Sequence, residues 1–194
     1  MKCEKLIKFL EKYGKVSEAE QGNLNKYFEF SSVKKKQIIV EKNFPCNKLF
    51  FVNDGILRTY YINDGGREIT RMLAWENRFI TNIESFRYAT KSHEIIECVE
   101  DAEILYISRE HFKKLVKASP DLKSVYADIL EEYTAFYVKR FEVLNTFDLN
   151  KKIQHLKEDF PPEIIKDLND TVLSSLIGIS REYFVKNKNL FYGK

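Results

Sequence analysis

The sequence predicts an α+β chain in which a region of short antiparallel strands is followed by a long helix and a terminal helix-turn-helix. Strand-like runs rich in β-branched and aromatic residues recur between Gln37 and Ile107. A long helical pattern follows Ser119, and two short helical patterns flank Gly178. These observations divide the 194 residues into expected domains over 1–118, 119–147 and 148–194.

Two short helices are expected before the first strand. Four apolar residues near the N-terminus share helical spacing: Leu6, Phe9, Leu10 and Tyr13. Further along, Ser17 and Glu20 have the spacing of a capping box, in which each side chain accepts a hydrogen bond from the other residue's backbone amide. A second helix is therefore expected to begin after Ser17.

The strand region contains short runs separated by turn signals. The runs cover residues 37–40, 49–52, 56–62, 68–73, 94–99 and 102–107. The turn sequences Asn53–Gly55 and Asn63–Gly66 suit positive φ angles, and both are expected to form tight hairpins. Short strands at this regular spacing are typical of an antiparallel barrel or a jelly roll.

A long helix is expected from Ser119, which can act as its N-cap with Pro120 in the first helical position. About 28 residues would give a helix of roughly 42 Å. Its apolar residues alternate steps of four and three, with Arg140 as the interruption: Leu122, Tyr126, Ile129, Tyr133, Phe136, Val143 and Phe147. This spacing favours a dimer seam, and the alternative is an amphipathic helix that packs on its own barrel.

The final segment has the pattern of a helix, a turn and a second helix. Asp170 can cap the first helix, Gly178 can adopt the left-handed turn conformation, and Ser180 can cap the second helix. The first helix has apolar residues at helical spacing: Val172, Leu173, Leu176 and Ile177. The N-terminal residues of such a second helix are the ones that enter a DNA major groove.

The distribution of charge also indicates a nucleic-acid partner for this segment. From Thr171 to Lys194, four cations and one carboxylate give a net charge of +3, which equals the formal net charge of the whole chain. The rest of the chain is therefore neutral. A basic tail on a neutral body is typical of a local nucleic-acid footprint.

Composition argues against several other classes of protein. Cys3, Cys46 and Cys98 are scattered, so neither a disulfide framework nor a zinc or iron–sulfur site is expected. The three histidines include no His-x-His pair, so a metal-dependent enzyme of the cupin type is not expected either. We expect no metal and no catalytic residue. Because the opening residues are rich in charge, we also expect a cytoplasmic protein without a membrane partner.

The order of β-roll, long helix and helix-turn-helix resembles the Crp/Fnr family of bacterial transcription regulators over essentially the full chain. The stretches that carry the resemblance are 52–58, 66–69, 98–107 and 178–182, the last reading Gly-Ile-Ser-Arg-Glu. The resemblance implies an N-terminal double-stranded β-helix, or jelly roll, of the cyclic-nucleotide-binding type with flanking helices. It also implies a dimerisation helix and a C-terminal winged-helix-like DNA-binding domain.

The resemblance breaks down at the effector site. Family members that bind cyclic AMP carry Gly-Glu-Leu at a helix start and then Arg-Ser-Ala around the phosphate. The corresponding positions in this chain are Thr81, Asn82 and Ile83, followed by Ser92, His93 and Glu94. A buried phosphate needs a countercharge, which Ser92 does not supply and Glu94 would oppose. The sequence therefore predicts a degenerate cassette with no cofactor and with absent or weak cyclic AMP binding. The effector is unknown or there is none.

A substitute countercharge for this cassette could come from neighbouring positions, because a loop alignment can slip by a few residues. The candidates are Arg78, Arg87 and Lys91. Each would have to direct its cation into the effector pocket.

The resemblance also implies roles for residues of the second terminal helix. Ser180 would cap the helix and present its backbone amide to a phosphate. Arg181 is positioned for a guanine and Glu182 for a cytosine amino group. Lys186, one turn beyond Glu182, would reach a base or a phosphate.

Residues around this helix complete the expected DNA-binding surface. Tyr183 would contact a sugar or a thymine methyl, and Lys188 would extend the basic surface, while Phe184 and Leu190 pack inward. The expected partners are a double-stranded DNA operator, a second copy of the chain and RNA polymerase. The alternative is a ligand-binding or protein-interaction module that does not bind DNA and whose helix-turn-helix is degenerate.

Overall fold

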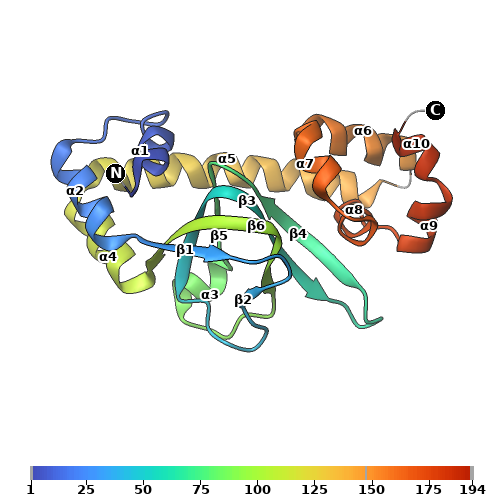
Figure 1. Cartoon of the computed structure of the whole chain (residues 1–194), viewed down its shortest axis with the longest axis horizontal. Coiled ribbons are helices and arrows are strands. Elements are labelled where there is room, and N and C mark those ends of the chain that lie inside the picture. The colour runs from blue at the N-terminus through green and yellow to red at the C-terminus, as the bar shows by residue number, and fades with distance from the viewer. Residues whose placement is uncertain (1, 147, 193–194) are drawn as a thin grey trace.

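The structure is a computed structural model that describes residues 2–146 and 148–192, and it places a β-roll beside one very long helix (Figure 1). The strands are β1 (Glu29–Val33), β2 (Ile38–Val40), β3 (Lys48–Ile62), β4 (Glu68–Ala74), β5 (Arg78–Ile80) and β6 (Ile95–Ser108). The two long strands, β3 and β6, pair with each other along most of their length. They form the centre of the sheet, to which the short strands are added.

The strands form two antiparallel layers because both long strands belong to each layer. In the first layer, the second half of β6 lies between β1 and the first half of β3, and that half of β3 also pairs with β5. In the second layer, the first half of β6 lies between β2 and the second half of β3, and that half of β3 also pairs with β4. This arrangement is a double-stranded β-helix, so the predicted fold class is confirmed.

The two turn sequences have different outcomes. Asn63–Gly66 forms the predicted hairpin between β3 and β4, in which the Gly66 amide donates to the Asn63 carbonyl over 2.9 Å and Gly66 has a φ of 73°. Asn53–Gly55 is not a hairpin. It lies inside β3, where the pairing with β6 shifts register and Gly55 has a φ of 85°. The expected strands on either side of it are therefore one bulged strand, and the last two expected strands are likewise one strand, β6.

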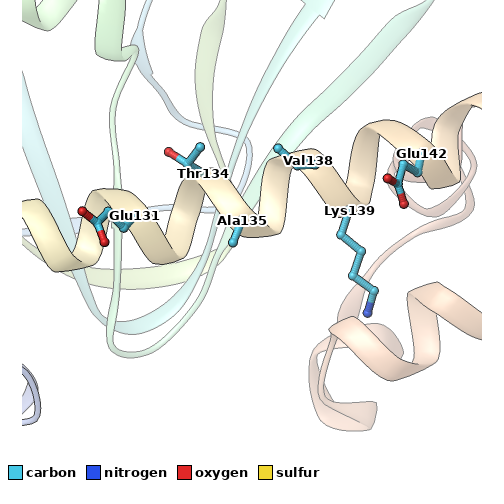
Figure 2. A pocket seen from close by; sticks show the side chains of 6 residues that line it. All are labelled: Glu131, Thr134, Ala135, Val138, Lys139 and Glu142. Carbon is cyan, nitrogen blue, oxygen red and sulfur yellow. The ribbon is translucent and has the colours of Figure 1, made fainter.

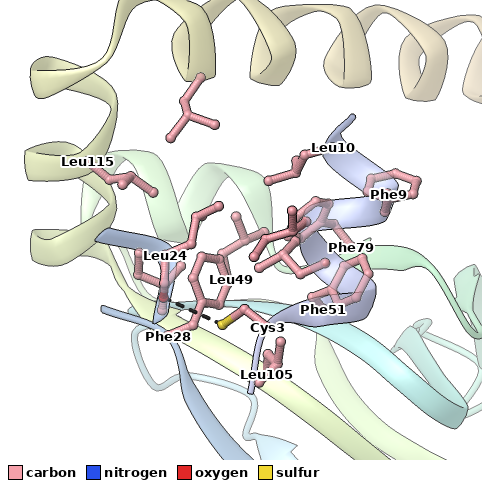
Figure 3. Packing of buried hydrophobic residues seen from close by; sticks show 14 of the residues in the cluster. Cys3, Phe9, Leu10, Leu24, Phe28, Leu49, Phe51, Phe79, Leu105 and Leu115 are labelled. Atoms are coloured by element: carbon pink, nitrogen blue, oxygen red, sulfur yellow. Dashed lines mark hydrogen bonds between the residues drawn. The ribbon is translucent and has the colours of Figure 1, made fainter. Parts of the chain in front are cut away.

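The helices before and after the roll share one apolar core with its first layer. They are α1 (Glu4–Leu10), α2 (Glu18–Tyr27) and α4 (Arg109–Ala118). The predicted capping box is present, because the Ser17 amide donates to Glu20 Oε2 over 2.7 Å and the Glu20 amide donates to Ser17 Oγ over 3.4 Å. Figure 3 shows how Phe9 of α1 meets Phe51 and Phe79 of the roll. Burial of this surface fixes one end of the long helix on the roll.

The long helix, α5 (Pro120–Asn145), begins at the predicted cap, where Ser119 Oγ accepts a hydrogen bond from the Leu122 amide over 3.0 Å. It runs past the roll to the C-terminal helices (Figure 1). Its apolar face is turned toward the chain's own core, where Ile129 is only 3% exposed and Tyr133 shares hydrogen bonds with the Phe79 backbone. The helix therefore packs as an amphipathic helix on its own roll.

This packing corrects the interpretation of the apolar face as a dimer seam. The residues concerned are Leu122, Tyr126, Ile129, Tyr133, Phe136 and Val143. Tyr126 makes an edge contact with Phe112 of α4, and Phe136 makes one with Phe160 in the C-terminal helices. The alternating spacing correctly predicted one apolar face of a helix, but that face packs within the chain and not on a second copy. Phe147 lies outside the described residues.

The C-terminal module consists of helices, which are α6 (Leu149–Asp159), α7 (Pro162–Asp167), α8 (Asp170–Leu176), α9 (Arg181–Lys186) and α10 (Lys188–Tyr192). Its core includes Ile56, Leu73 and Val99, which belong to the roll, so the module is packed directly on the second layer. Between residues 148 and 192 there is no strand, and the wing implied by the resemblance is therefore not part of the described module. Among the described residues, no helix combines the length and apolarity needed to span a bilayer.

Candidate functional site

A small cavity lies between the roll and α5, where the resemblance places an effector. Its volume is about 170 Å³. The side chains around it are mostly apolar: Leu49, Met72, Phe79, Ile80, Ile83, Ile129 and Leu130, with Arg71, Thr81, Thr134 and three tyrosines. The cavity therefore joins strands of both layers to the middle of the long helix.

Arg71 of β4 carries the charge nearest to the cavity, and this charge is paired within the protein. Its Nε donates to Glu94 Oε1, and its Nη2 donates to Glu94 Oε2 over 2.9 Å. Asn82 Nδ2 donates to the same Oε2 atom over 2.7 Å. Glu94 is only 2% exposed, so Arg71 and Asn82 supply the partners that a buried carboxylate requires.

The ion pair is also tied to α5. Arg71 Nη1 donates to the Tyr137 hydroxyl over 2.6 Å. Burial alone would lower the pKa of Arg71, but its bonds with Glu94 and Tyr137 outweigh burial and raise that pKa. Burial raises the pKa of Tyr137 as well, so this hydroxyl stays protonated at neutral pH. The network connects the cassette, the roll and the long helix.

The residues predicted for the effector pocket divide into two groups. Thr81 and Ile83 line the cavity, and Ile83 is 45% exposed at its mouth. Asn82 caps helix α3 (Ile83–Tyr88) by accepting from the Ser85 amide over 2.9 Å, and Ser92 exchanges hydrogen bonds with the Glu94 backbone. His93 is exposed and does not line the cavity.

The expected substitute cations do not reach the cavity. Arg78 stacks on Trp75, Arg87 lies over the exposed ring of Tyr88, and Lys91 is exposed on the loop after α3. None of the three lines the cavity, which is adjoined instead by Arg71. Sequence reasoning missed Arg71 because it lies on β4, ten residues before the cassette begins.

A second hollow is an open groove along the outer face of α5. Figure 2 shows the side chains that line it: Glu131, Thr134, Ala135, Val138, Lys139 and Glu142. Val138 is 58% exposed and Phe141, on the same side of the helix, is 70% exposed. These are large apolar surfaces for a helix whose other face is already buried.

The helix-turn-helix forms as predicted, with one change at its first cap. Ser180 Oγ accepts from the Tyr183 amide over 3.1 Å, and Gly178 takes the left-handed conformation with a φ of 69°. The cap of α8 is Asn169, whose side chain accepts from the Val172 amide over 3.0 Å, so Asp170 is the first helical residue and not the cap. The turn geometry is thus set by side-chain capping and one glycine.

The second helix, α9, presents its polar side chains to solvent. The exposed residues include Arg181, Glu182 and Lys186, together with Tyr183, which is 50% exposed. Phe184 is only 2% exposed and anchors the helix on the module core, as predicted. The helix therefore places its cations and hydrogen-bonding groups at the surface of the molecule.

Two residues after α9 differ from expectation. Lys188 was expected to extend the DNA-binding surface. Its Nζ lies 2.7 Å from Asp170 Oδ1, so its charge is paired with a carboxylate of α8. Leu190 is 45% exposed, so the expectation that it packs inward is wrong. Asn187 is the C-cap of α9, and its side chain donates to the Tyr183 carbonyl over 2.8 Å.

The structure also shows two buried cations that sequence reasoning did not single out as functional. Arg140 Nη2 donates to the Thr70 carbonyl over 3.0 Å and to the Leu176 carbonyl over 2.6 Å. Lys152 Nζ donates to the carbonyls of Leu144 and Ile177, each over 2.9 Å. Burial lowers the pKa of Arg140 to about 10, and burial with the nearby Arg140 lowers that of Lys152. Both side chains hold the module on α5 through backbone carbonyls.

Within the described part of the chain, no group of three or more histidine, cysteine, aspartate or glutamate side chains could hold a metal ion. The three cysteines are free and buried. Burial and neighbouring carboxylates raise the pKa of Cys98 to about 11, which keeps that thiol protonated.

With this geometry established, comparisons define the class of fold. Residues 30–119 match the family described as the cyclic nucleotide-binding domain. Among curated proteins, no sequence matches the chain. The resemblance stated from the sequence is confirmed at the level of the fold, because solved structures of Crp/Fnr regulators superpose on both the roll and the terminal helices.

Three solved structures illustrate the similarity. A protein described as a transcriptional regulator of the Crp/Fnr family from Eubacterium rectale is 21% identical with a TM-score of 0.71, covering 91% of this chain and 83% of its own. The c-di-GMP responsive global regulator CLP of Xanthomonas campestris is 18% identical with a TM-score of 0.72, over 90% and 91% of the two chains. A Crp/Fnr family regulator from Thermus thermophilus is 19% identical with a TM-score of 0.65, over 85% and 87%.

Proposed function

We propose that the chain is a DNA-binding transcriptional regulator of the Crp/Fnr type and not an enzyme. The observation that carries the proposal is the exposed helix α9, which places Arg181, Glu182 and Lys186 on the surface while Phe184 anchors it from below. A capped helix with this division of faces suits insertion into a major groove. The shared fold supports the same function.

The proposed DNA contacts are a subset of those expected from the sequence. Arg181 reads a guanine through its two parallel donors, Glu182 accepts from a cytosine amino group, and Lys186 contacts a base or a phosphate. Tyr183 packs against a sugar or a thymine methyl. Ser180 positions the helix by capping it, and Lys188 is left out because it pairs with Asp170.

We propose that two copies associate through the outer face of α5. Exposed residues recur on this face in steps of four and three: Ala127, Glu131, Thr134, Val138 and Phe141. The helix has 26 residues, which at 1.5 Å per residue is roughly 39 Å, long enough for an extended contact. A second copy would cover Val138 and Phe141 and supply the two-fold axis that a symmetric operator requires.

The dimer is tested by sedimentation of the purified full chain. Phe141→Asp should convert dimer to monomer at low micromolar concentration, because it replaces the most exposed apolar side chain of the proposed contact with a charge. Phe44→Asp is the matched control, since Phe44 is 61% exposed on the loop between β2 and β3 and lines a hollow that no residue of α5 adjoins. If both variants sediment like the wild type, the outer face of α5 is not the interface.

The regulator is proposed to work without a cyclic nucleotide. Glu94 already satisfies Arg71, and a cyclic phosphate brought to the same place would meet the carboxylate of Glu94. Titration with cyclic AMP should therefore leave the thermal midpoint of the protein unchanged. An increase of several degrees at sub-millimolar cyclic AMP would refute this part of the proposal.

DNA binding is tested by selecting bound sequences from a random duplex library with the wild-type protein. The expected result is an inverted repeat whose half-sites are about one helical turn apart, or a multiple of it. Arg181→Ala should relax the selected base at one position of each half-site, whereas Lys166→Ala, which removes an exposed cation on α7, should leave the selected sequence unchanged. Failure of the wild type to enrich any sequence would favour the alternative, a protein-interaction module with a degenerate helix-turn-helix.

A further inference from the structure

The charge beside the cavity is not available to a charged ligand. Arg71 is the one charged residue among the described side chains that line the cavity, and both of its outer faces are engaged by Glu94 and Tyr137. An anionic ligand would have to displace the Glu94 carboxylate, which would then be buried without its counterion. A cationic ligand would meet the guanidinium itself. The electrostatics of the cavity therefore favour a neutral ligand.

Most of the polar groups at the cavity wall are also satisfied. Tyr133 accepts from the Phe79 amide over 2.8 Å, and the Thr81 hydroxyl donates to the Lys48 carbonyl over 2.8 Å. Tyr137 accepts from Arg71 and points its proton at the sulfur of Met72, 2.9 Å away. The Tyr126 hydroxyl has no hydrogen-bond partner among the described residues. A ligand of this cavity can thus be largely apolar.

The size of the cavity limits what can enter. Its volume of about 170 Å³ is similar to that of an engineered apolar cavity of about 150 Å³ that binds benzene. A purine nucleotide, with a two-ring base, a sugar and a phosphate, is far larger than one aromatic ring. Ile83 and Thr134 are the exposed residues of its lining, so the mouth of the cavity lies at these two side chains.

We propose that this cavity binds an uncharged, mainly apolar small molecule of about the size of a single aromatic ring. The inference rests on the proposed function, since it names the class of effector that such a regulator would sense. Tyr137, at the cavity, and Arg140, which holds the C-terminal module, are one turn apart on α5. A ligand between the roll and α5 therefore acts on the helix that positions the DNA-binding module.

The proposal is tested by titrating the full-length protein with three probes in the absence of DNA. Toluene is the neutral probe, benzoate is an anion of nearly the same shape, and cyclic AMP is the large anionic probe. We expect toluene to bind at least tenfold more tightly than benzoate and cyclic AMP not to compete with it. Absence of toluene binding, or benzoate binding as tightly as toluene, would overturn the proposal.

Variants at the mouth of the cavity locate the binding. Ile83→Trp should fill the entrance and weaken toluene binding at least tenfold. Tyr88→Trp is the matched control, because Tyr88 lies on the same helix, is 67% exposed and does not line the cavity. Equal toluene affinity in the wild type and the Ile83→Trp variant would place binding elsewhere and contradict the proposal.

A charge variant tests the role assigned to Glu94. Glu94→Gln frees Arg71, so benzoate should gain at least tenfold in affinity. Because one unpaired buried cation could destabilise the fold, the double variant Arg71→Met, Glu94→Gln removes both charges and should retain toluene binding. Loss of toluene binding in a folded double variant would contradict the proposal. All of these readouts are independent of DNA, so they can fail while operator selection succeeds, or the reverse.

Discussion

Arg140 of the long helix donates a hydrogen bond of 2.6 Å to the carbonyl of Leu176, in the first helix of the helix-turn-helix. The same guanidinium donates to the carbonyls of Thr70 and Arg71 on β4, over 3.0 and 3.2 Å. One side chain therefore joins α5, the roll and the C-terminal module. A neighbouring contact of 2.5 Å between the hydroxyls of Thr70 and Ser175 strengthens the same junction.

We predict that Arg140→Met loosens the C-terminal module. The substitution removes three hydrogen bonds to backbone carbonyls, at a cost on the order of 2 kcal/mol in the free energy of unfolding. Urea unfolding measures this loss, and hydrogen exchange should rise in α8 before it rises in the roll. Lys123→Met, at an exposed position of the same helix, should change stability by less than about 0.5 kcal/mol. A similar effect of both variants would count against the junction.

Two glycines should respond to alanine in opposite directions. A Cβ atom at Gly55 would overlap the Asp101 carbonyl oxygen, and the residue has a φ of 85°, so Gly55→Ala should destabilise the roll by about 1–3 kcal/mol. Gly22 lies inside α2 with no heavy atom within 4 Å of an added Cβ. Gly22→Ala should therefore stabilise the protein by about 0.5–1 kcal/mol. Thermal unfolding of both variants checks the signs.

We predict that stability falls as the pH rises above 10. Burial and a hydrogen bond to Glu132 raise the pKa of Tyr13 to about 12. Burial also raises the pKa values of other tyrosines: Tyr60, Tyr126, Tyr133 and Tyr137. An unfolded tyrosine loses its proton near pH 10, so between about pH 10 and 12 the folded chain binds more protons than the unfolded chain, and stability declines with pH.

Ultraviolet absorbance of tyrosinate measures this effect. The folded protein should show a large fraction of its tyrosine ionisation only above pH 11, accompanied by unfolding. Protein unfolded in guanidinium should ionise with a single midpoint near pH 10. Superimposable titrations of the folded and unfolded protein would show that the tyrosine pKa values are not raised.

Replacements in α9 should separate base reading from phosphate contact. Arg181→Ala should cost about 1–3 kcal/mol on the selected operator and relax preference at one base pair of each half-site. Lys186→Ala should instead weaken selected and unrelated duplexes by similar factors. Binding measured on the operator and on single-base variants distinguishes the two, and small, equal effects of both substitutions would remove α9 as the recognition helix.

Much of this fold was predictable from the sequence because local signals were strong. The caps at Ser17, Ser119 and Ser180 and the turn at Gly178 are all where the sequence indicates. Strand continuity was less predictable, because Asn53–Gly55 has the composition of a hairpin but serves as a bulge in β3. Whether such a sequence reverses the chain or bends it depends on the partner strand, which local sequence does not specify.

The face of α5 and the charge at the cavity were not predictable for a related reason. A helix with apolar residues in steps of four and three packs equally well on a partner or on its own roll, and only the tertiary structure distinguishes them. Arg71 and Glu94 are 23 positions apart in the sequence. They meet because β4 and the first half of β6, which Glu94 directly precedes, both pair with the second half of β3. No spacing rule links two such residues.

The most direct test of DNA recognition by a dimer is a salt titration of binding to the selected inverted repeat. The account predicts a steep linear fall of log K with log salt. In the Lys186→Ala dimer the slope should be smaller by roughly 2, because each of the two copies loses one phosphate contact and each contact contributes about 0.9 to the slope. The Lys166→Ala control should keep the wild-type slope. A slope near zero for the wild type, or equal slopes for the wild type and Lys186→Ala, would contradict DNA recognition through α9.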